Sequence, residues 1–189
     1  MRRCRLSIAE RKNRQKAERE ARIVAAARLV AEREGWAAVT IRRLADEIEH
    51  SQPVLYAHFA NRDAIVAAVA LQGFGELAAA LRDAARASPV DALGAVAAAY
   101  VDFALRKPAL YQAMFVLPTG LRFAEAGAGP ELRAAFEALA AVVSADVDAD
   151  AATETLWAAL HGLAELERAG RIRPGARAER IALLVRLLG

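Results

Sequence analysis

A length of 189 residues allows one or two domains with a buried core, and an apolar fraction of 56% excludes an intrinsically disordered chain. The single cysteine, Cys4, excludes an internal disulfide and favours a reducing, cytoplasmic compartment, while no run of about 18 apolar residues and no apolar signal core is found, so we expect neither a membrane span nor a secretory signal. The net charge is only +3, but the first 22 residues carry 9 basic and 3 acidic side chains, a basic arm that favours a polyanionic partner.

Residues that favour helices dominate, and strand and hairpin signals are missing, so we predict an all-α fold of about nine helices. The first helix is predicted to end near Gly35, with the basic arm extending it backward. Its apolar residues recur at helical spacing: Ile23, Ala26, Ala27, Val30 and Ala31. Thr40 is the expected N-cap of a second, short helix over 41–48. Ser51 is the expected N-cap of a third, over 52–58, with Pro53 in its first turn.

The remaining helices are expected to follow at breaks marked by polar caps and prolines. Asn61 is predicted to cap a fourth helix over 62–87. Five more are expected, separated by a loop over 118–129 and by shorter connections: 89–106, 107–117, 130–146, 151–169 and 176–188. We therefore expect two domains, a basic arm with a DNA-binding helical domain over 1–66 and a ligand-binding and dimerisation bundle over 67–189.

The first domain has the plan of a helix-turn-helix, because two short helices joined by a tight turn follow a longer bracing helix. The second short helix of such a motif enters the DNA major groove. Leu55 and Phe59 are four residues apart and are expected to face the core, which leaves a DNA side: Gln52, Pro53, Val54, Tyr56 and His58. Gln pairs with adenine, Pro or Val meets the thymine methyl group, and Tyr or His donates to phosphates.

The segment TIRRLADEIEHSQPVLYAHFANRDAI, residues 40–65, resembles the DNA-binding domain of the TetR family of transcriptional regulators. The resemblance rests on a Thr at the start of the second helix, a Leu-Ala pair, the Ser cap, the pattern Leu-Tyr-x-His-Phe, and a basic residue three positions on. It implies that Arg42 and Gln52 read bases. It implies phosphate contacts for four residues: Thr40, Tyr56, His58 and Arg62. Their neighbours Arg43 and Ser51 complete the expected DNA interface.

The turn of the motif departs from the family. Family members have Ala-Gly-Val before the serine, whereas this chain has Ile48, Glu49 and His50. Glycine adopts a left-handed backbone at no steric cost, but a glutamate there is expected to be strained by about 1 kcal/mol. Either the turn differs slightly from that of the family, or the strain is tolerated.

The segment LWAALHGLAEL, with Trp157, His161 and Gly162, resembles a C-terminal ligand-binding domain named for its Trp-His-Gly residues, and KPALYQAMF over 107–115 fits the same type. Two interpretations remain for Trp157 and His161. They line a ligand pocket or a dimer contact, or they pack in the core with satisfied ring N–H groups, which we favour. The candidate ligand-binding residues form a set that is also typical of an ordinary core: Tyr100, Phe103, Tyr111, Met114, Phe115, Trp157 and His161.

The last two helices are strongly apolar, so we expect them to pair with a second copy in a four-helix dimer interface. The predicted function is a ligand-responsive, sequence-specific DNA-binding transcriptional regulator. We expect a repressor that an unknown small molecule releases from a palindromic operator. The alternative is a helical protein-interaction adaptor without specific DNA binding. GxSxG, HExxH and phosphate-loop motifs are missing and the three histidines fit no metal spacing, so no enzyme activity, metal or cofactor is expected.

Overall fold

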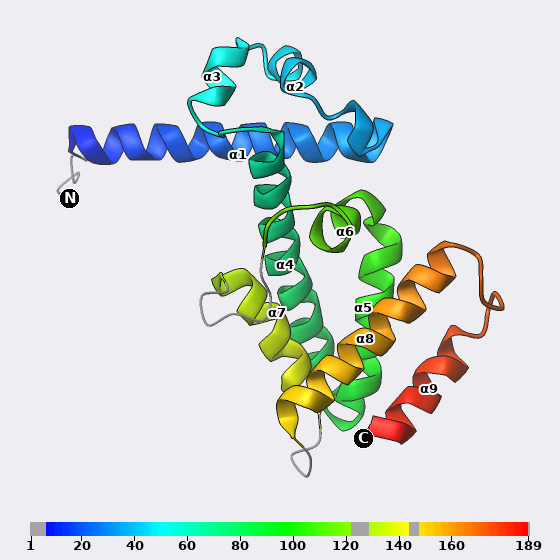
Figure 1. Ribbon diagram of the computed structural model, residues 1–189. Coiled ribbons are helices and arrows are strands. Elements are labelled where there is room, and N and C mark those ends of the chain that lie inside the picture. Colours follow the sequence, from blue (N-terminus) through cyan, green and yellow to red (C-terminus); the bar gives the residue numbers. More distant parts are fainter. Residues whose placement is uncertain (1–6, 122–128, 144–147, 189) are drawn as a thin grey trace. The chain divides into compact units, whose positions relative to one another are not determined.

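The computed structural model describes residues 7–121, 129–143 and 148–188. Within these ranges the regular elements are nine α-helices and two short 3-10 helices, without strands, which confirms the predicted all-α fold (Figure 1). The chain divides into two compact units. One comprises Met1–Ala70 with Gln112–Gly120, and the other Leu71–Tyr111 with Leu121–Gly189. This division falls inside the fourth helix, a few residues after the boundary expected at 66.

The first unit begins with a long helix, α1 (Ile8–Glu34). Its start is fixed by a capping box, in which the Ser7 hydroxyl accepts from the Glu10 amide at 3.2 Å and the Glu10 carboxylate accepts from the Ser7 amide at 2.6 Å. It ends at Gly35, whose φ of 80° suits only glycine without strain. The C-terminal half of α1 buries the predicted apolar residues, so the expected first helix and its backward extension are confirmed.

A 3-10 turn, η1 (Trp36–Ala38), leads into α2 (Ile41–Glu47) and α3 (Gln52–Tyr56). The Thr40 hydroxyl accepts from the Arg43 amide at 3.1 Å, which confirms it as the N-cap of α2. Between the two helices Glu49 has a φ of 55°, and the amide of His50 donates to the carbonyl of Ala45 at 2.9 Å. The turn thus keeps a left-handed residue, and the strain at Glu49 is tolerated.

The capping prediction for Ser51 is correct in position and wrong in its hydrogen bond. Ser51 is the N-cap residue of α3, but none of the amides in the described part of the chain donates to its hydroxyl. An N-cap side chain accepts from the amides two and three positions on, here those of residues 53 and 54, and neither is available. Pro53 has no N–H, and the Val54 amide donates to the Ser51 carbonyl at 3.0 Å.

The helix α4 (Arg62–Ala87) has the bounds that the sequence predicted, and Asn61 caps it by accepting from the Ala64 amide at 2.8 Å. An 18-residue window of α4 is long and apolar enough, by length and composition alone, to cross a membrane, with a mean hydropathy of 1.8, although polar residues interrupt its apolar run. Half of that window is buried inside the protein. Its buried residues include Ile65, Val69, Phe74, Leu77 and Leu81, as in a core helix of a soluble fold.

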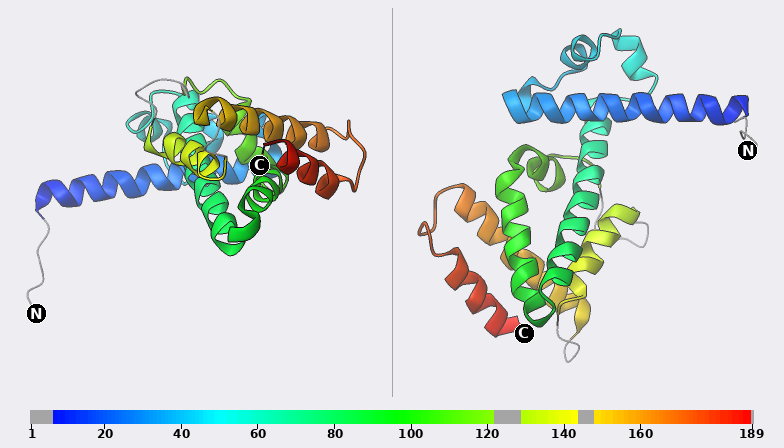
Figure 2. Two further views of the ribbon diagram at one scale, coloured as in Figure 1. Left: turned by 90° about the horizontal axis from the view of Figure 1, so that it is seen from below. Right: turned by 180° about the vertical axis from the view of Figure 1, so that it is seen from behind.

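The second unit contains the rest of α4 and the helices that follow. After the 3-10 turn η2 (Pro89–Asp91) come α5 (Ala92–Arg106), α6 (Pro108–Phe115), which crosses the division, α7 (Pro130–Ala140), α8 (Ala149–Arg168) and α9 (Arg177–Leu188). The helix α5 packs against α8 and α9, and α7 packs against α8, as both views of Figure 2 agree. The predicted helix to 146 ends earlier, at Ala140, and the predicted loop over 118–129 lies mostly outside the described residues.

Ion pairs to α5 and α8 hold the beginning of α9 in place. Arg177 binds Asp102 of α5 at 2.6 Å and Glu167 of α8 at 3.0 Å, and Arg180 also reaches Glu167 at 3.4 Å. The hydrogen bond from Arg177 lowers the pKa of the Glu167 carboxyl. Farther along α9, Leu183 and Leu187 are exposed, so one side of this apolar helix remains uncovered in the single chain.

Candidate nucleic-acid interface

The short helix α3 is anchored by one buried residue and exposes most of the others. Leu55 is fully buried in the core of the first unit, whereas Phe59, expected to be equally buried, is only half-buried. Gln52 and Pro53 are exposed, and Tyr56 is 54% exposed. A five-residue helix has too few internal hydrogen bonds to stand alone. The buried Leu55 therefore holds the helix in place, and the side chains of Gln52, Pro53 and Tyr56 remain exposed to solvent.

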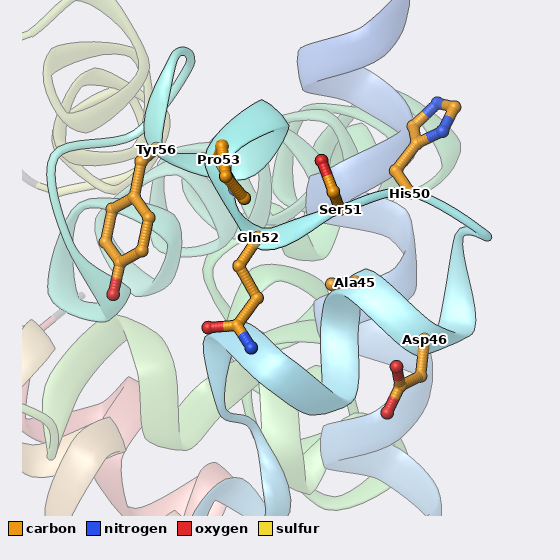
Figure 3. A pocket seen from close by; sticks show the side chains of 7 residues that line it. All are labelled: Ala45, Asp46, His50, Ser51, Gln52, Pro53 and Tyr56. Atoms are coloured by element: carbon orange, nitrogen blue, oxygen red, sulfur yellow. The ribbon is translucent and has the colours of Figure 1, made fainter.

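The exposed residues of α3 border a shallow hollow of about 540 Å³. Its wall is formed by the end of α2, the turn and α3: Ala45, Asp46, His50, Ser51, Gln52, Pro53 and Tyr56. In Figure 3 the amide of Gln52 and the phenol of Tyr56 extend in the same direction. An amide that donates and accepts, a phenol and a proline ring are groups that meet base edges, phosphates and thymine methyl groups.

Asp46 and His50 line this hollow although the sequence did not point to them. Their place in the sequence was a usable signal, because Asp46 lies in the last turn of α2 and His50 lies in the turn between the two short helices. A carboxylate such as that of Asp46 repels phosphates but accepts from the exocyclic amine of cytosine. Asp46 therefore favours a base edge over a phosphate in its part of the hollow.

The two arginines at the start of α2 have different surroundings. The side chain of Arg42 is exposed, as is Thr40 before it. Arg43 instead bridges two carboxylates, Glu34 of α1 at 2.9 Å and Glu47 of α2 at 2.6 Å. Because these carboxylates balance its charge, Arg43 braces α2 against α1, and Arg42 is the better-placed of the two for a DNA contact.

Two of the predicted phosphate contacts are occupied within the fold. The His58 side chain is only 7% exposed, and its Nδ1 lies 3.3 Å from a carboxylate oxygen of Glu20 on α1. Arg62 donates from Nε to the carbonyl of Val39 and from Nη2 to the carbonyl of Trp36, both at 2.8 Å. The structure gives both side chains a role in holding the motif together, and their contacts with phosphate stay predictions.

In the second unit, four of the candidate ligand-binding residues form one polar chain. Trp157 Nε1 donates to the Tyr100 hydroxyl at 3.0 Å, that hydroxyl lies 3.0 Å from the Tyr111 hydroxyl, and the latter lies 2.6 Å from His161 Nδ1. Every hydroxyl proton finds an acceptor if each tyrosine donates onward toward His161, an arrangement that requires a neutral imidazole. Trp157 Nε1 and His161 Nδ1 are thus hydrogen-bonded and both side chains are half-buried, so the choice between a ligand pocket and core packing stays a prediction.

The protonation of this polar chain is set by burial. Burial raises the pKa of Tyr100 and of Tyr111 well above the usual range of tyrosine. Burial also lowers the pKa of His161, against the opposing effect of the Glu165 carboxylate. All four side chains are consequently neutral at physiological pH. The hydrogen-bonded row of Tyr100, Tyr111, Trp157 and His161 therefore has no formal charge.

The other three candidates lie on the helices that carry Tyr100 and Tyr111. Phe103 is buried on α5, beneath the ammonium of Lys107, which lies 5.0 Å from the ring centre. Met114 and Phe115 belong to the segment assigned to the first unit, where Met114 is buried and Phe115 is partly exposed.

Comparison with known proteins gives two family matches. Residues 23–69 match the bacterial regulatory proteins of the tetR family, and residues 93–188 match a tetracyclin repressor-like C-terminal domain. An uncharacterised HTH-type transcriptional regulator of Mycobacterium tuberculosis is 32% identical over 157 residues, which cover 78% of this chain and 69% of that protein. These relatives are transcriptional regulators, not enzymes.

Solved structures show the same similarity over most of the chain. A TetR-family transcriptional regulator from Pectobacterium atrosepticum has a TM-score of 0.67 and 25% identity, covering 92% of this chain and 94% of its own. The multidrug binding protein EbrR, complexed with imidazole, has a TM-score of 0.62 and 25% identity, covering 91% and 90% of the two chains.

Proposed function

Since this chain belongs to the TetR family of DNA-binding transcriptional regulators, we propose that it is a homodimeric repressor released from a near-palindromic operator by a small molecule. The observation that carries the DNA-binding part is the face of α3. Gln52, Pro53 and Tyr56 are exposed beside a hollow while Leu55 alone anchors the helix. This is the arrangement of a recognition helix that reads the major groove.

Dimerisation is supported by the uncovered apolar side chains of the last two helices. Leu166 on α8 is 41% exposed, and Leu183 and Leu187 on α9 are 49% and 71% exposed. Burying such side chains against a second copy stabilises a dimer by roughly 25 cal/mol for each Å² of apolar surface removed from water. A two-fold dimer has two recognition helices, which explains the proposed near-palindromic operator.

Ligand response is supported by the uncharged polar chain of Tyr100, Tyr111, Trp157 and His161 and by the similarity to EbrR, which binds imidazole. Neutral hydrogen-bonding groups among apolar helices suit an uncharged, partly aromatic effector. Such an effector lowers operator affinity if it binds better to a state whose recognition helices are wrongly spaced for DNA.

The proposal is tested by selecting genomic DNA fragments with the purified protein and measuring binding of the recovered sequences at a fixed salt concentration. We expect a shared, near-palindromic motif and a dimeric species in sedimentation measurements. A monomer at micromolar concentration that enriches no DNA motif would support the alternative, a helical protein-interaction adaptor.

The ligand part has a separate test based on tryptophan fluorescence. The chain has two tryptophans, Trp36 in the first unit and Trp157 in the second. In the variant Trp36→Phe, emission reports on Trp157 alone. Compounds that release the operator are expected to change this emission with the same concentration dependence. Release without any change at Trp157 would contradict an effector site at the polar chain.

A further inference from the structure

The amino-terminal half of α1 is exposed on all sides within the described structure. From Ile8 to Arg19 all residues are exposed, and the first buried residue is Ile23. At a rise of about 1.5 Å per residue, these twelve residues form a projection of about 18 Å. Figures 1 and 2 show this part of α1 running beyond α2 and α3.

This exposed segment is nevertheless specified as a helix by its own sequence. The capping box of Ser7 and Glu10 fixes its first turn. Two exposed ion pairs at i,i+4 spacing, Arg14–Glu18 at 3.6 Å and Lys16–Glu20 at 3.7 Å, support the turns that follow. Pairs of this kind contribute only a few tenths of a kcal/mol each, so they shape the helix without binding it to the rest of the protein.

The side of α1 that is apolar in its second half becomes basic in its first half. Lys12, Lys16 and Arg19 precede Ile23 by 11, 7 and 4 residues, so the helical repeat places them on the same side as Ile23. Ile23 is fully buried in the core of the first unit. The side of α1 that is buried at Ile23 therefore carries exposed basic side chains in the amino-terminal half of the helix.

The basic side begins beside the recognition helix. Glu20, one residue after Arg19, lies 3.3 Å from His58, which directly follows the last turn of α3. A DNA duplex in contact with α3 would bring its flanking phosphates toward this projection. Along each DNA strand the phosphates are spaced by roughly 3.4 Å, so the projection spans roughly five nucleotides.

We propose that the exposed amino-terminal half of α1 is a second DNA-contacting element, whose Lys12, Lys16 and Arg19 bind phosphates flanking the base pairs read by α3. The inference rests on the proposed DNA-binding function and adds a site outside the helix-turn-helix. Contacts to phosphates carry no base preference, so this element raises affinity and salt sensitivity without changing the operator sequence that is preferred.

The chain offers a matched pair of variants for the test. Lys12→Gln with Lys16→Gln removes two charges from the proposed side, and Arg11→Gln with Arg14→Gln removes two from a different side of the same turns. Each variant also loses one exposed i,i+4 ion pair. Glutamine is nearly as good a helix former as lysine and arginine, so helix content measured by circular dichroism should match in both.

Binding is measured on duplexes recovered by genomic selection, either trimmed to the shared near-palindromic motif or extended by ten base pairs on each side of it. On extended duplexes, Lys12→Gln with Lys16→Gln should make the slope of log affinity against log salt shallower by about two units for each arm that engages, since two phosphate contacts are lost. The DNase footprint should shorten at both ends. On trimmed duplexes the difference from the wild type should largely vanish, and Arg11→Gln with Arg14→Gln should change the slope much less.

Equal slopes and footprints for the two double variants would overturn the second contact while leaving operator binding intact. A wild-type protein that enriches no fragment is a different result, because it overturns the proposed function itself. A loss of slope that is the same on trimmed and extended duplexes would place these lysines within the operator core and would also contradict a flanking contact.

Discussion

At the scale of single residues, Gln52 is the side chain best placed to read a base. It is exposed at the first position of α3 and lines the hollow beside Tyr56. Its amide can donate to and accept from adenine at the same time. Gln52→Ala should therefore cost roughly 1–3 kcal/mol of binding free energy on the selected operator.

The assignment of Gln52 is decided by a double-mutant cycle at one salt concentration. On an operator whose contacted base pair has been replaced, Gln52→Ala should cost much less, because the wild-type pairing is already lost there. Equal losses on both operators would show that Gln52 only covers the start of the helix.

Glu49 has a backbone conformation that is unfavourable for any residue with a side chain. Its φ of 55° lies in the left-handed region, which costs a non-glycine residue about 1–2 kcal/mol. Glu49→Gly should raise the unfolding free energy by about 0.5–1 kcal/mol, because the relief of strain exceeds the larger entropy loss of glycine. Glu49→Ala keeps the strain and serves as the control in chemical denaturation. A destabilised Glu49→Gly would show that the carboxylate makes a compensating contribution.

His161 makes stability depend on pH with a defined sign. Burial is the main reason that its pKa in the folded protein lies below the usual value of about 6.5, while the Glu165 carboxylate acts in the opposite direction. The unfolded chain therefore binds a proton at higher pH than the folded protein. The contribution of His161 to stability is complete above about pH 6.5 and is lost as the pH falls from there toward the folded pKa.

The measurement compares the thermal midpoint of the wild type with that of His161→Gln from pH 7.5 to pH 5.5. Gln retains an oxygen that can accept from Tyr111, and all other ionisable side chains are the same in the two proteins. The wild type should lose more of its thermal stability on acidification. Parallel profiles for the two proteins would show that His161 titrates alike in the folded and unfolded states.

At the scale of elements, Arg62 connects the start of α4 to the segment before α2. Its guanidinium donates to the carbonyls of Trp36 and Val39, so it holds the 3-10 turn that positions the helix-turn-helix. Arg62→Ala should lower the unfolding free energy by about 1.5–3 kcal/mol, the range for hydrogen bonds that involve a charged group.

Arg62→Lys separates this structural role from the predicted phosphate contact. A lysine keeps the charge but not the planar fork that reaches two carbonyls. If the role is structural, Arg62→Lys should lose nearly as much stability in urea as Arg62→Ala. A lysine variant with full stability and a salt slope unchanged from the wild type would instead support a simple phosphate contact.

At the scale of the whole molecule, dimerisation is expected to depend on α9. Leu183→Glu with Leu187→Glu places two charges on its exposed apolar side and should give a folded monomer in sedimentation measurements. Its affinity for the full palindrome should fall toward that for a half-site, since two linked sites bind more tightly than one. Val90→Glu is the control, because Val90 is an apolar side chain that is 100% exposed on a different element. A dimeric Leu183→Glu with Leu187→Glu variant would contradict the proposed interface.

The sequence alone determined which segments form helices and where most of them begin. Thr40, Asn61 and Gly35 mark boundaries that the structure reproduces, and α4 has the predicted bounds. The sequence also indicated that Glu49 is strained if the turn keeps its left-handed backbone. These features are local. A cap, a helical repeat or a turn depends on residues about four positions apart, so the order of the residues contains the necessary information.

Only the tertiary structure decided what the conspicuous polar side chains do. His58 meets Glu20 from 38 positions away, and Arg62 meets Trp36 from 26 positions away, so two expected phosphate contacts have partners inside the fold. The Tyr100–Trp157 bond joins residues 57 positions apart. Such partners are set by how helices pack, and spacing along the chain cannot encode them, because many residues share the same helical side. The exposed basic side of α1 also depended on the tertiary structure. Its charges are present in the sequence, but only the packing shows that no described helix covers them.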